Sequence, residues 1–262
     1  MSRTDQCVLS VIAPCYNEAV NIDLLVRRTL AAFDAMTIDG QLILVDDGSV
    51  DETWAAISAA ADEDRRVWGV RHERNRGIVP AWQSGLDAAR GRLVCLIDSD
   101  LQNRPEDIAR LHRVYELGGA DVVQGARRPV CTVHRHRVFT RGLNALLNLA
   151  FRTRLRDNKS GFLLCRRDTL SAILRHRLAY RYFQAFVGVA ATARGFVIKE
   201  VDTVFEPRRA GQSFLSRFPI RTSLRIVWEL IKFRAETWLD ARGRVGRRSV
   251  LLSSPASLAD AL

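Results

Sequence analysis

Short apolar runs alternate with amphipathic patterns along the first 126 residues, and this alternation limits the fold more than any other feature of the sequence. Strands are predicted at residues 7–13, 41–45, 67–70, 93–97 and 121–124. Apolar residues at helical spacing fill the intervals 18–35, 51–61, 79–89 and 105–117. Strands that alternate with helices predict a mostly parallel sheet with right-handed crossovers and helices on both faces. We therefore expect an α/β, Rossmann-like domain.

The second half of the chain follows a less regular pattern. Strands are predicted at 162–165, 196–201 and 203–205, and helices at 143–151, 168–174 and 182–193. Basic loops are expected at 127–141 and 207–216. Neither a clear linker nor an internal repeat interrupts the chain, so we expect one domain over residues 1–216, with residues 7–126 and 127–216 as its two halves.

A further helix is predicted within residues 217–241, and a flexible tail over residues 242–262. One stripe of this helix contains Ile220, Leu224, Val227, Ile231 and Trp238. Four basic residues lie largely elsewhere: Arg217, Arg221, Arg225 and Lys232. An apolar stripe edged with Arg and Trp is typical of a helix in a membrane interface, and equally of a helix packed on its own domain.

The composition is that of a globular protein, with 47% hydrophobic and 26% charged residues. The five cysteines are scattered and form no C-x-x-C pair, which predicts neither a disulfide framework nor a zinc site and favours a reducing compartment. The N-terminus lacks the pattern of a signal peptide, and no uncharged apolar run approaches the ~18 residues needed to cross a bilayer. We expect a chain that does not span a membrane.

Charge is divided unevenly between the halves. The net charge is +11, but residues 1–126 contain 13 Lys+Arg against 20 Asp+Glu, and residues 127–262 contain 27 against 9. A basic half predicts an anionic partner, which could be a phosphate-bearing substrate, a membrane surface or nucleic acid.

Two carboxylates and an amide follow the strand predicted at 93–97, in the order Asp98, Asp100 and Gln102. Hard oxygen ligands suit Mg²⁺ or Mn²⁺, and Mg²⁺ is commonly held by one or two carboxylates together with substrate phosphates. An isolated Asp-x-Asp is more often a polar turn after a strand. Two other polar clusters favour a cation site over a simple turn: residues 14–18 follow the first strand, and residues 46–51 follow the second. Ligands of parallel sheets bind at the carboxyl ends of the strands, where all three clusters fall.

Together these three motifs resemble the GT-A fold of family 2 inverting glycosyltransferases, over residues 8 to about 213. Within that family the sequence is most similar to the polyprenyl-phosphate glycosyltransferases of the dolichol-phosphate mannose synthase type. The narrower resemblance rests on Asp98-x-Asp100-x-Gln102 followed by Pro105-Glu106, on the turn 157–162 (DNKSGF), and on the loop 208–213 (RRAGQS).

The resemblance implies a role for each motif residue. The donor nucleotide sugar would be bound in residues 7–126, by Pro14, Tyr16, Asn17, Glu18, Asp46, Asp47, Gly77, Asp98 and Ser99. Mg²⁺ or Mn²⁺ would be held by Asp98, Asp100 and Gln102. The reacting centre would include Asp157, Asp100 and Arg128. The acceptor phosphate would be bound in residues 127–216, by Arg127, Arg128, Arg137, Ser160, Arg208, Arg209 and Ser213.

The chain departs from the family pattern at three places. A Lys commonly follows the family's Asn-x-Gly, but Ile78 follows Gly77 here, which makes Arg74 or Arg76 the candidate replacement. The family's Gly-x-Ser-Lys appears here as Gly211-Gln212-Ser213-Phe214, so Phe214 stands where the family has Lys. Many bacterial relatives continue into two transmembrane helices, whereas this chain offers one amphipathic helix at 217–241.

The implied activity is transfer of a sugar from a GDP- or UDP-linked donor to a polyprenyl phosphate, dolichyl or undecaprenyl. The enzyme would be peripheral on the cytoplasmic face of a membrane, with no nucleic-acid partner and with a homo-oligomer or a small membrane subunit possible. A phosphate monoester is already ionised at neutral pH and needs no general base, so an arginine-rich pocket suits it.

Two alternatives stay open. The sugar could go to the hydroxyl of a soluble small molecule or polysaccharide, in which case Asp157 becomes the leading candidate for the base. The fold could instead serve as a nucleic-acid or membrane-binding module without catalysis, which predicts steeply salt-dependent binding of polyanions.

Overall fold

The computed structural model describes most of the domain and part of the C-terminal helix. The described residues are 7–128, 147–149, 151, 153–158, 160–176, 178, 180, 182–207, 225 and 228–237. Four of the predicted acceptor residues, Arg137, Arg208, Arg209 and Ser213, lie outside these ranges, as does the predicted tail 242–262.

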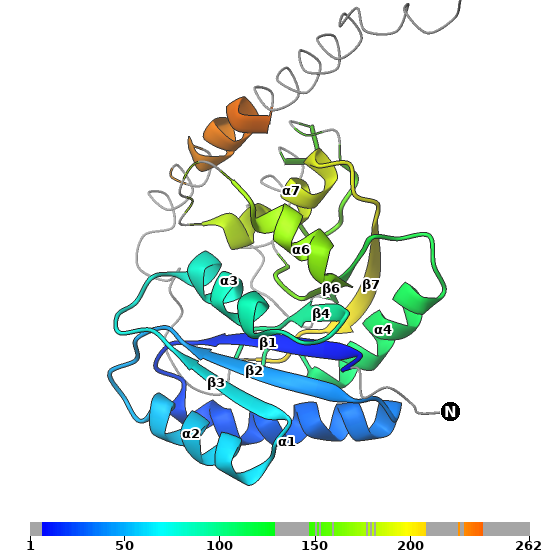
Figure 1. The fold of residues 1–262 in the computed structure, drawn as a ribbon. Helices are drawn as coiled ribbons and strands as arrows, with labels where there is room; N and C mark the ends of the chain where they lie inside the picture. The colour runs from blue at the N-terminus through cyan, green and yellow to red at the C-terminus, as the bar shows by residue number, and fades with distance from the viewer. Residues whose placement is uncertain are drawn as a thin grey trace, which may run out of the picture.

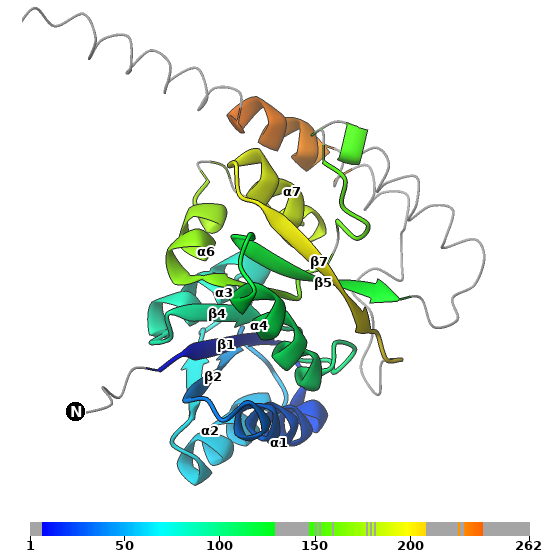
Figure 2. The ribbon, with the colours of Figure 1, turned by 90° about the vertical axis from the view of Figure 1, so that its right-hand side faces the viewer.

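Seven strands form one sheet in the order β3-β2-β1-β4-β6-β5-β7 (Figures 1 and 2). The strands are β1 (Leu9–Cys15), β2 (Gly40–Asp46), β3 (Val67–Arg71), β4 (Leu93–Leu96), β5 (Val122–Arg128), β6 (Leu163–Arg166) and β7 (Ile198–Val204). Strand β6 runs antiparallel to both of its neighbours, β4 and β5, while every other pair is parallel. The predicted mostly parallel α/β sheet is confirmed.

Helices cover both faces of the sheet, as predicted. One face packs against α1 (Ala19–Met36), α2 (Thr53–Glu63) and α4 (Ile108–Glu116), which follows the short 3₁₀ turn η1 (Pro105–Asp107). The other face packs against α3 (Ile78–Ala88), α6 (Arg167–Leu174), the 3₁₀ turn η2 (Phe183–Phe186) and α7 (Val187–Ala193). Because both faces are covered, the central strands carry nearly continuous apolar runs.

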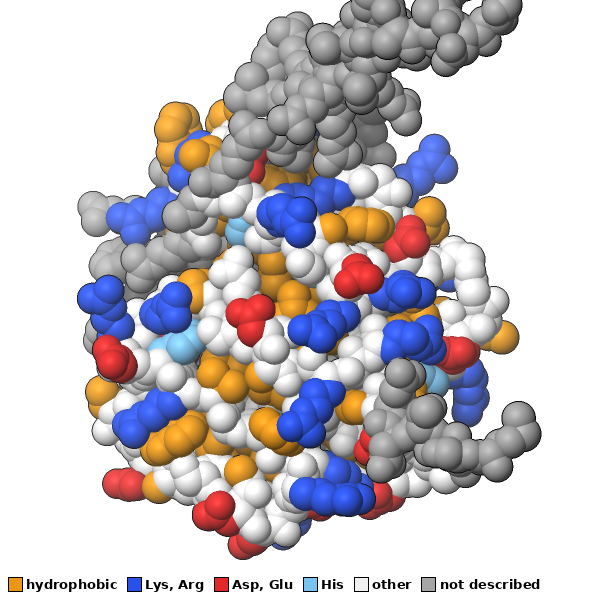
Figure 3. Space-filling view, viewed as in Figure 1, with side chains coloured by type: hydrophobic (Ala, Val, Ile, Leu, Met, Phe, Trp, Pro, Cys, Tyr) orange, Lys and Arg blue, Asp and Glu red, His pale blue; other side chains and the backbone are white. Residues whose placement is uncertain are grey.

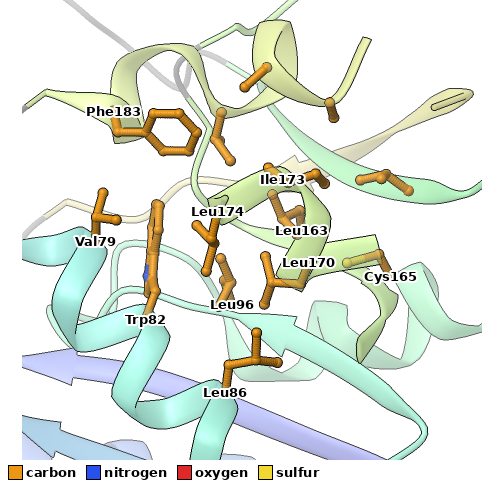
Figure 4. Packing of buried hydrophobic residues seen from close by; sticks show 14 of the residues in the cluster. Val79, Trp82, Leu86, Leu96, Leu163, Cys165, Leu170, Ile173, Leu174 and Phe183 are labelled. Atoms are coloured by element: carbon orange, nitrogen blue, oxygen red, sulfur yellow. The ribbon is translucent and has the colours of Figure 1, made fainter. Parts of the chain in front are cut away.

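The core on the α3 side joins the two halves of the chain (Figure 4). Trp82 of α3 lies beside Leu174 of α6, with Phe183 of η2 above it, and all three side chains are buried. Burying each such side chain contributes roughly 1.5–3 kcal/mol. The first half of the domain is therefore packed directly on the second.

Two elements differ from their predicted bounds. Residues 196–201 and 203–205 were expected as two strands, but β7 is continuous through Asp202 because its whole length pairs with β5, from Ile198 opposite Val122 to Val204 opposite Arg128. The helix expected over 182–193 is divided into the 3₁₀ turn η2 and the α-helix α7.

Residues 228–237 are helical and pack on the domain through Leu230 and Phe233, which are buried. Trp228 and Ile231 are 61% and 56% exposed, so Ile231, the described member of the predicted stripe, does not pack on the domain. Among the described residues, no helix is both long and apolar enough to cross a lipid bilayer. Figure 3 shows Lys and Arg side chains spread over the visible face rather than collected in one patch.

Candidate functional site

The parallel register brings the polar clusters predicted at three strand ends to one edge of the sheet. Cys15 of β1 lies opposite Asp46 of β2, and Asp46 lies opposite Arg71 of β3. The segment after β4 is tied to the same edge, since Ser99 Oγ donates a hydrogen bond to the Pro14 carbonyl oxygen at 2.8 Å.

The loop after β1 is bound to the loop after β2 by side chains of both. Asn17 has a left-handed backbone (φ 55°), its N–H donates to Ser49 Oγ at 3.0 Å, and its Oδ1 accepts from the Val50 N–H at 3.0 Å. The Glu18 N–H donates to Thr53 Oγ1 at 2.9 Å. A non-glycine residue in this conformation costs energy and is held by its surroundings, which is common at ligand sites.

Asp46 is a buried carboxylate at the end of β2. Its Oδ1 accepts from the Ser49 N–H at 3.0 Å, and its Oδ2 lies 3.5 Å from Arg71 Nε without hydrogen-bond geometry. The Arg71 guanidinium stacks over Trp54, 5.4 Å from the ring centroid. The buried Oδ2 can therefore accept a hydrogen bond from a ligand N–H, beside a cation that sequence reasoning did not single out.

Asp47 is engaged by the loop that follows β3. It accepts from the N–H groups of Arg76 and Gly77 at 2.9 and 2.8 Å, and His72 Nδ1 lies 2.7 Å from its Oδ1. His72 Nε2 in turn lies 2.9 Å from Ser84 Oγ. The resemblance implied that Asp47 and Gly77 contact the donor nucleotide sugar. In the structure, Asp47 accepts hydrogen bonds from the loop that contains Gly77 and holds that loop in shape.

Gly48 allows the loops after β2 and β3 to touch. Its φ is +72°, and a Cβ there would lie 2.3 Å from the backbone carbonyl carbon of Arg74. Any side chain would separate the two loops, so this position requires glycine.

Asp98, Asp100 and Gln102 lie in a tight turn after β4. Asp100 Oδ1 accepts from the Gln102 N–H at 3.1 Å, and the intervening Leu101 is buried with φ 59°. Asp98 Oδ1 accepts from Gln184 Nε2 at 3.0 Å, and Asp98 Oδ2 from Asn103 Nδ2 at 3.4 Å. The two carboxylates are thus fixed in orientation on a strained turn at the sheet edge.

These residues fit a hard divalent cation that also binds a substrate phosphate. Within the described part of the chain, no three His, Cys, Asp or Glu side chains gather in a way that could hold a metal ion. Two carboxylates and one amide are nevertheless the oxygen donors that Mg²⁺ takes when phosphates and water complete its coordination. The donor set therefore suits a shared ion rather than one enclosed by protein.

Arg127 and Asp157 form a paired unit next to this turn. Arg127 Nε and Nη2 donate to the two carboxylate oxygens of Asp157 at 2.6 and 2.7 Å, and the Arg127 N–H adds a third hydrogen bond at 3.3 Å. Burial lowers the pKa of Arg127, but the hydrogen bond and charge of Asp157, with the charges of Asp98 and Asp100, outweigh burial and raise it. The guanidinium is therefore a fixed cation within the field of the Asp98 turn.

Ser160 and the end of β7 border the same region. Ser160 is buried, and its Oγ has no hydrogen-bond partner among the described residues. The Glu206 N–H donates to the Gln102 carbonyl oxygen at 2.8 Å, so the chain after β7 runs beside the Asp98 turn. Arg128 is the last residue of β5, directly after Arg127.

Sequence reasoning found the residues of the strand-end clusters but missed one neighbour of Asp46 and one hydrogen-bond donor to Asp98. Arg71 and Gln184 were not predicted, although Arg71 directly follows the strand predicted at 67–70, at the same edge. Its position directly after a predicted strand could have identified Arg71 as a site residue. Gln184 offered no such signal, because it lies 86 residues from Asp98 in an aromatic segment.

The model of one protein family, described as Glycosyl transferase family 2, matches residues 10–181 of the chain. Two similar curated proteins both bear the name undecaprenyl-phosphate 4-deoxy-4-formamido-L-arabinose transferase. The one from Pseudomonas fluorescens is 32% identical over 91% of this chain and 68% of its own length. The one from Aeromonas hydrophila is 41% identical over 49% of this chain, and the match spans only 39% of that relative.

A solved structure shares the fold at low identity. It is glucosyl-3-phosphoglycerate synthase from Mycobacterium tuberculosis in complex with Mn²⁺, UDP-glucose and phosphoglyceric acid, with a TM-score of 0.63 and 20% identity. The match covers 87% of this chain and 80% of that one.

Proposed function

The chain belongs to glycosyl transferase family 2, and we propose that it transfers a sugar from a nucleoside diphosphate sugar to a polyprenyl phosphate with Mg²⁺ or Mn²⁺. The names of the similar undecaprenyl-phosphate transferases support the lipid acceptor. The Mn²⁺ and UDP-glucose bound by the similar synthase support the donor and the ion.

The observation that carries this proposal is the pairing of Asp157 with Arg127. A hydroxyl acceptor needs a general base, and Asp157 was the leading candidate on sequence grounds. Its carboxylate oxygens instead accept three hydrogen bonds from Arg127, which engage the atoms that a base would use. A phosphate acceptor is already ionised and needs a positioned cation, which Arg127 provides.

The donor would lie across the edge formed by β1, β2 and β4. Asp46 would accept from a base N–H, and Pro14, Tyr16, Asn17 and Glu18 would line the base and ribose, with Asp47 and Gly77 shaping the far side of the site. Asp98, Asp100 and Gln102 would hold Mg²⁺ or Mn²⁺, with Ser99 between the carboxylates. The ion supplies charge stabilisation to the departing diphosphate.

The acceptor would approach from the side of β5 and the 157–162 turn. Arg127, fixed by Asp157, would orient the acceptor phosphate, and the buried Ser160 hydroxyl would donate to it. Arg128, Arg137, Arg208, Arg209 and Ser213 are the further candidates for that phosphate. In this proposal residues 7–126 bind the donor and 127–216 the acceptor.

A lipid acceptor places the reaction at a membrane surface, and the C-terminal helix offers an anchor. Residues 228–237 leave Trp228 and Ile231 exposed, next to the basic side chains of Lys232 and Arg234. An exposed Trp and Ile bordered by cations suits the headgroup region. We propose a peripheral enzyme on the cytoplasmic face, in which the helix packs on the domain with one side and contacts lipid with the other.

The test is transfer of radiolabel from GDP- and UDP-linked sugars to undecaprenyl phosphate, scored as label extracted into organic solvent. Wild type with Mn²⁺ should label the lipid with at least one donor, and Asp100→Ala should not. Hydrolysis of a donor without any lipid product, while a soluble sugar alcohol or polysaccharide becomes labelled, would overturn the lipid acceptor. Calorimetry with GDP and UDP in Mn²⁺ identifies the base.

A further inference from the structure

Gln184 joins the second half of the chain to the Asp98 turn. Its Nε2 donates to Asp98 Oδ1 at 3.0 Å. Asn103, which is close to Asp98 in sequence, donates from Nδ2 to Asp98 Oδ2 over a longer distance of 3.4 Å. The shorter of these two contacts therefore comes from η2, a segment that belongs to neither the donor motifs nor the predicted acceptor residues.

A donor on a carboxylate that binds a metal sets the direction of the remaining lone pairs. Such outer hydrogen bonds fix the orientation of the ligand, and their loss typically costs about 10–100-fold in metal affinity. A neutral amide is well suited to this role, because it holds the carboxylate without competing with the ion for charge.

Two sets of contacts fix the position of η2. The rings of Phe183 and Phe186 pack against Phe233 of the C-terminal helix, with centroid distances of 6.2 and 5.4 Å. The N–H of Tyr182, two residues before Gln184, donates to Glu229 Oε2 of the same helix at 2.8 Å. Aromatic pairs of this kind stabilise packing beyond the burial of their area, and a hydrogen bond to a carboxylate is stronger than one between neutral groups.

The space around the Gln184 amide is closed on the side of the 157–162 turn. A Cβ on Gly161 would lie 3.1 Å from Gln184 Nε2 and 3.3 Å from its Cγ. The absence of a side chain at Gly161 thus leaves the room that the Gln184 side chain occupies on its way to Asp98.

We propose that Gln184 is a positioning residue for the metal-binding carboxylate of Asp98, and that the C-terminal helix, through Glu229 and Phe233, holds Gln184 in place. The inference rests on the proposed use of Asp98 for a divalent ion. Its consequence is that the strength of metal and diphosphate binding in the first half depends on a helix at the other end of the chain.

The test measures Mn²⁺ binding directly, by electron paramagnetic resonance of free Mn²⁺ with saturating UDP or GDP. Gln184→Met keeps the length of the side chain and removes its donor, so Mn²⁺ should bind about 10-fold more weakly. Gln41→Met is the matched control, because the Gln41 side chain is, like that of Gln184, hydrogen bonded within the domain, to Ser10, Ala88 and Arg90 at the other end of the sheet. It should lower the melting temperature and leave Mn²⁺ affinity unchanged.

Two further variants test the same link without removing the amide. Gly161→Ala should displace Gln184 and weaken Mn²⁺ binding in a protein that keeps its glutamine. Glu229→Ala should weaken it less, and Thr237→Ala, on the same helix, should have no effect. Unchanged Mn²⁺ affinity in folded Gln184→Met would overturn the proposal. Failure of the proposed function is separate, since it would appear as tight Mn²⁺ and nucleotide binding by wild type without transfer to lipid.

Discussion

Asp157→Asn is the substitution that separates the two mechanisms open to this site. If Asp157 fixes Arg127, the change removes the negative charge. It also leaves one side-chain oxygen to accept from Arg127 Nε and Nη2, which bind two oxygens in the wild type. If Asp157 is a general base for a hydroxyl acceptor, the change removes the group that takes the proton. Both predict a slower enzyme, so the rate alone does not decide between them.

The cost in stability follows from the geometry of the pair. Asp157 is 14% exposed and Arg127 29% exposed, so the pair is mostly but not fully withdrawn from water. Removing one partner of a buried ion pair costs ~3–5 kcal/mol, and a single hydrogen bond to a charged group ~1.5–3 kcal/mol. Because solvent reaches the guanidinium and Asn keeps one acceptor, we expect a loss of about 2 kcal/mol. The melting temperature should fall by roughly 4–8 °C.

The assay that decides is kcat/KM for transfer to polyprenyl phosphate as a function of pH. The second ionisation of a phosphate monoester has a pKa of about 6, so wild type should lose activity below that pH because the acceptor becomes protonated. In Asp157→Asn this acid limb should persist, with kcat/KM lowered by a similar factor at every pH.

Disappearance of the acid limb in Asp157→Asn would refute this reasoning, because it would show that the limb belongs to Asp157. The control is a double-mutant cycle with Arg127→Gln. Paired residues should show a coupling of about 1–3 kcal/mol in unfolding free energy, and coupling near zero would mean that the pair seen in the structure contributes nothing.

Three other outcomes are expected. Gly48→Ala should destabilise the protein by more than Gly118→Ala, measured by urea unfolding, because both glycines have positive φ but only at Gly48 would a Cβ meet backbone; equal losses would contradict the close approach. Burial lowers the pKa of His176 in the folded protein. As pH drops from about 6.5, the unfolded state therefore binds a proton at His176 before the folded state does, and the free energy of unfolding should fall. His176→Phe should flatten that decline between pH 7 and 5. The Arg28 hydrogen bond lowers the pKa of Glu106, so its contribution to stability is present at neutral pH and declines as pH falls below about 4.5, and the stability deficit of Glu106→Gln should be smaller at pH 3 than at pH 7.

The fold of the first half could be predicted because each element is local. The apolar runs at residues 7–13 and 41–45 were visible as strands, and the rule that parallel strands place their carboxyl ends together brought the two polar clusters that follow them to one edge. The antiparallel direction of the strand at residues 163–166 could not be predicted. A buried run of four residues has the same apolar pattern in a parallel and in an antiparallel strand.

The site was predictable to the extent that its residues lie in local motifs. Asp98, Asp100 and Gln102 are close in sequence and recognisable together. Arg127, which pairs with Asp157, is 30 residues away from it, and Gln184, which donates to Asp98, is 86 residues away, so these contacts depend on the packing of whole elements. Asp47 illustrates the opposite limit, because its position was predicted but its contacts with the loop after β3 were not.

The reversed strand β6 has a consequence for how the chain folds as it is synthesised. Within the described sheet, both neighbours of β5, which are β6 and β7, follow it in sequence, and β4 lacks its second neighbour until residue 166 has been made. The first half therefore emerges with an unfinished sheet edge that is prone to pairing with other chains. A ribosome-bound fragment ending near residue 126 should need a chaperone, and the edge should close only when residues 163–166 arrive to complete the sheet.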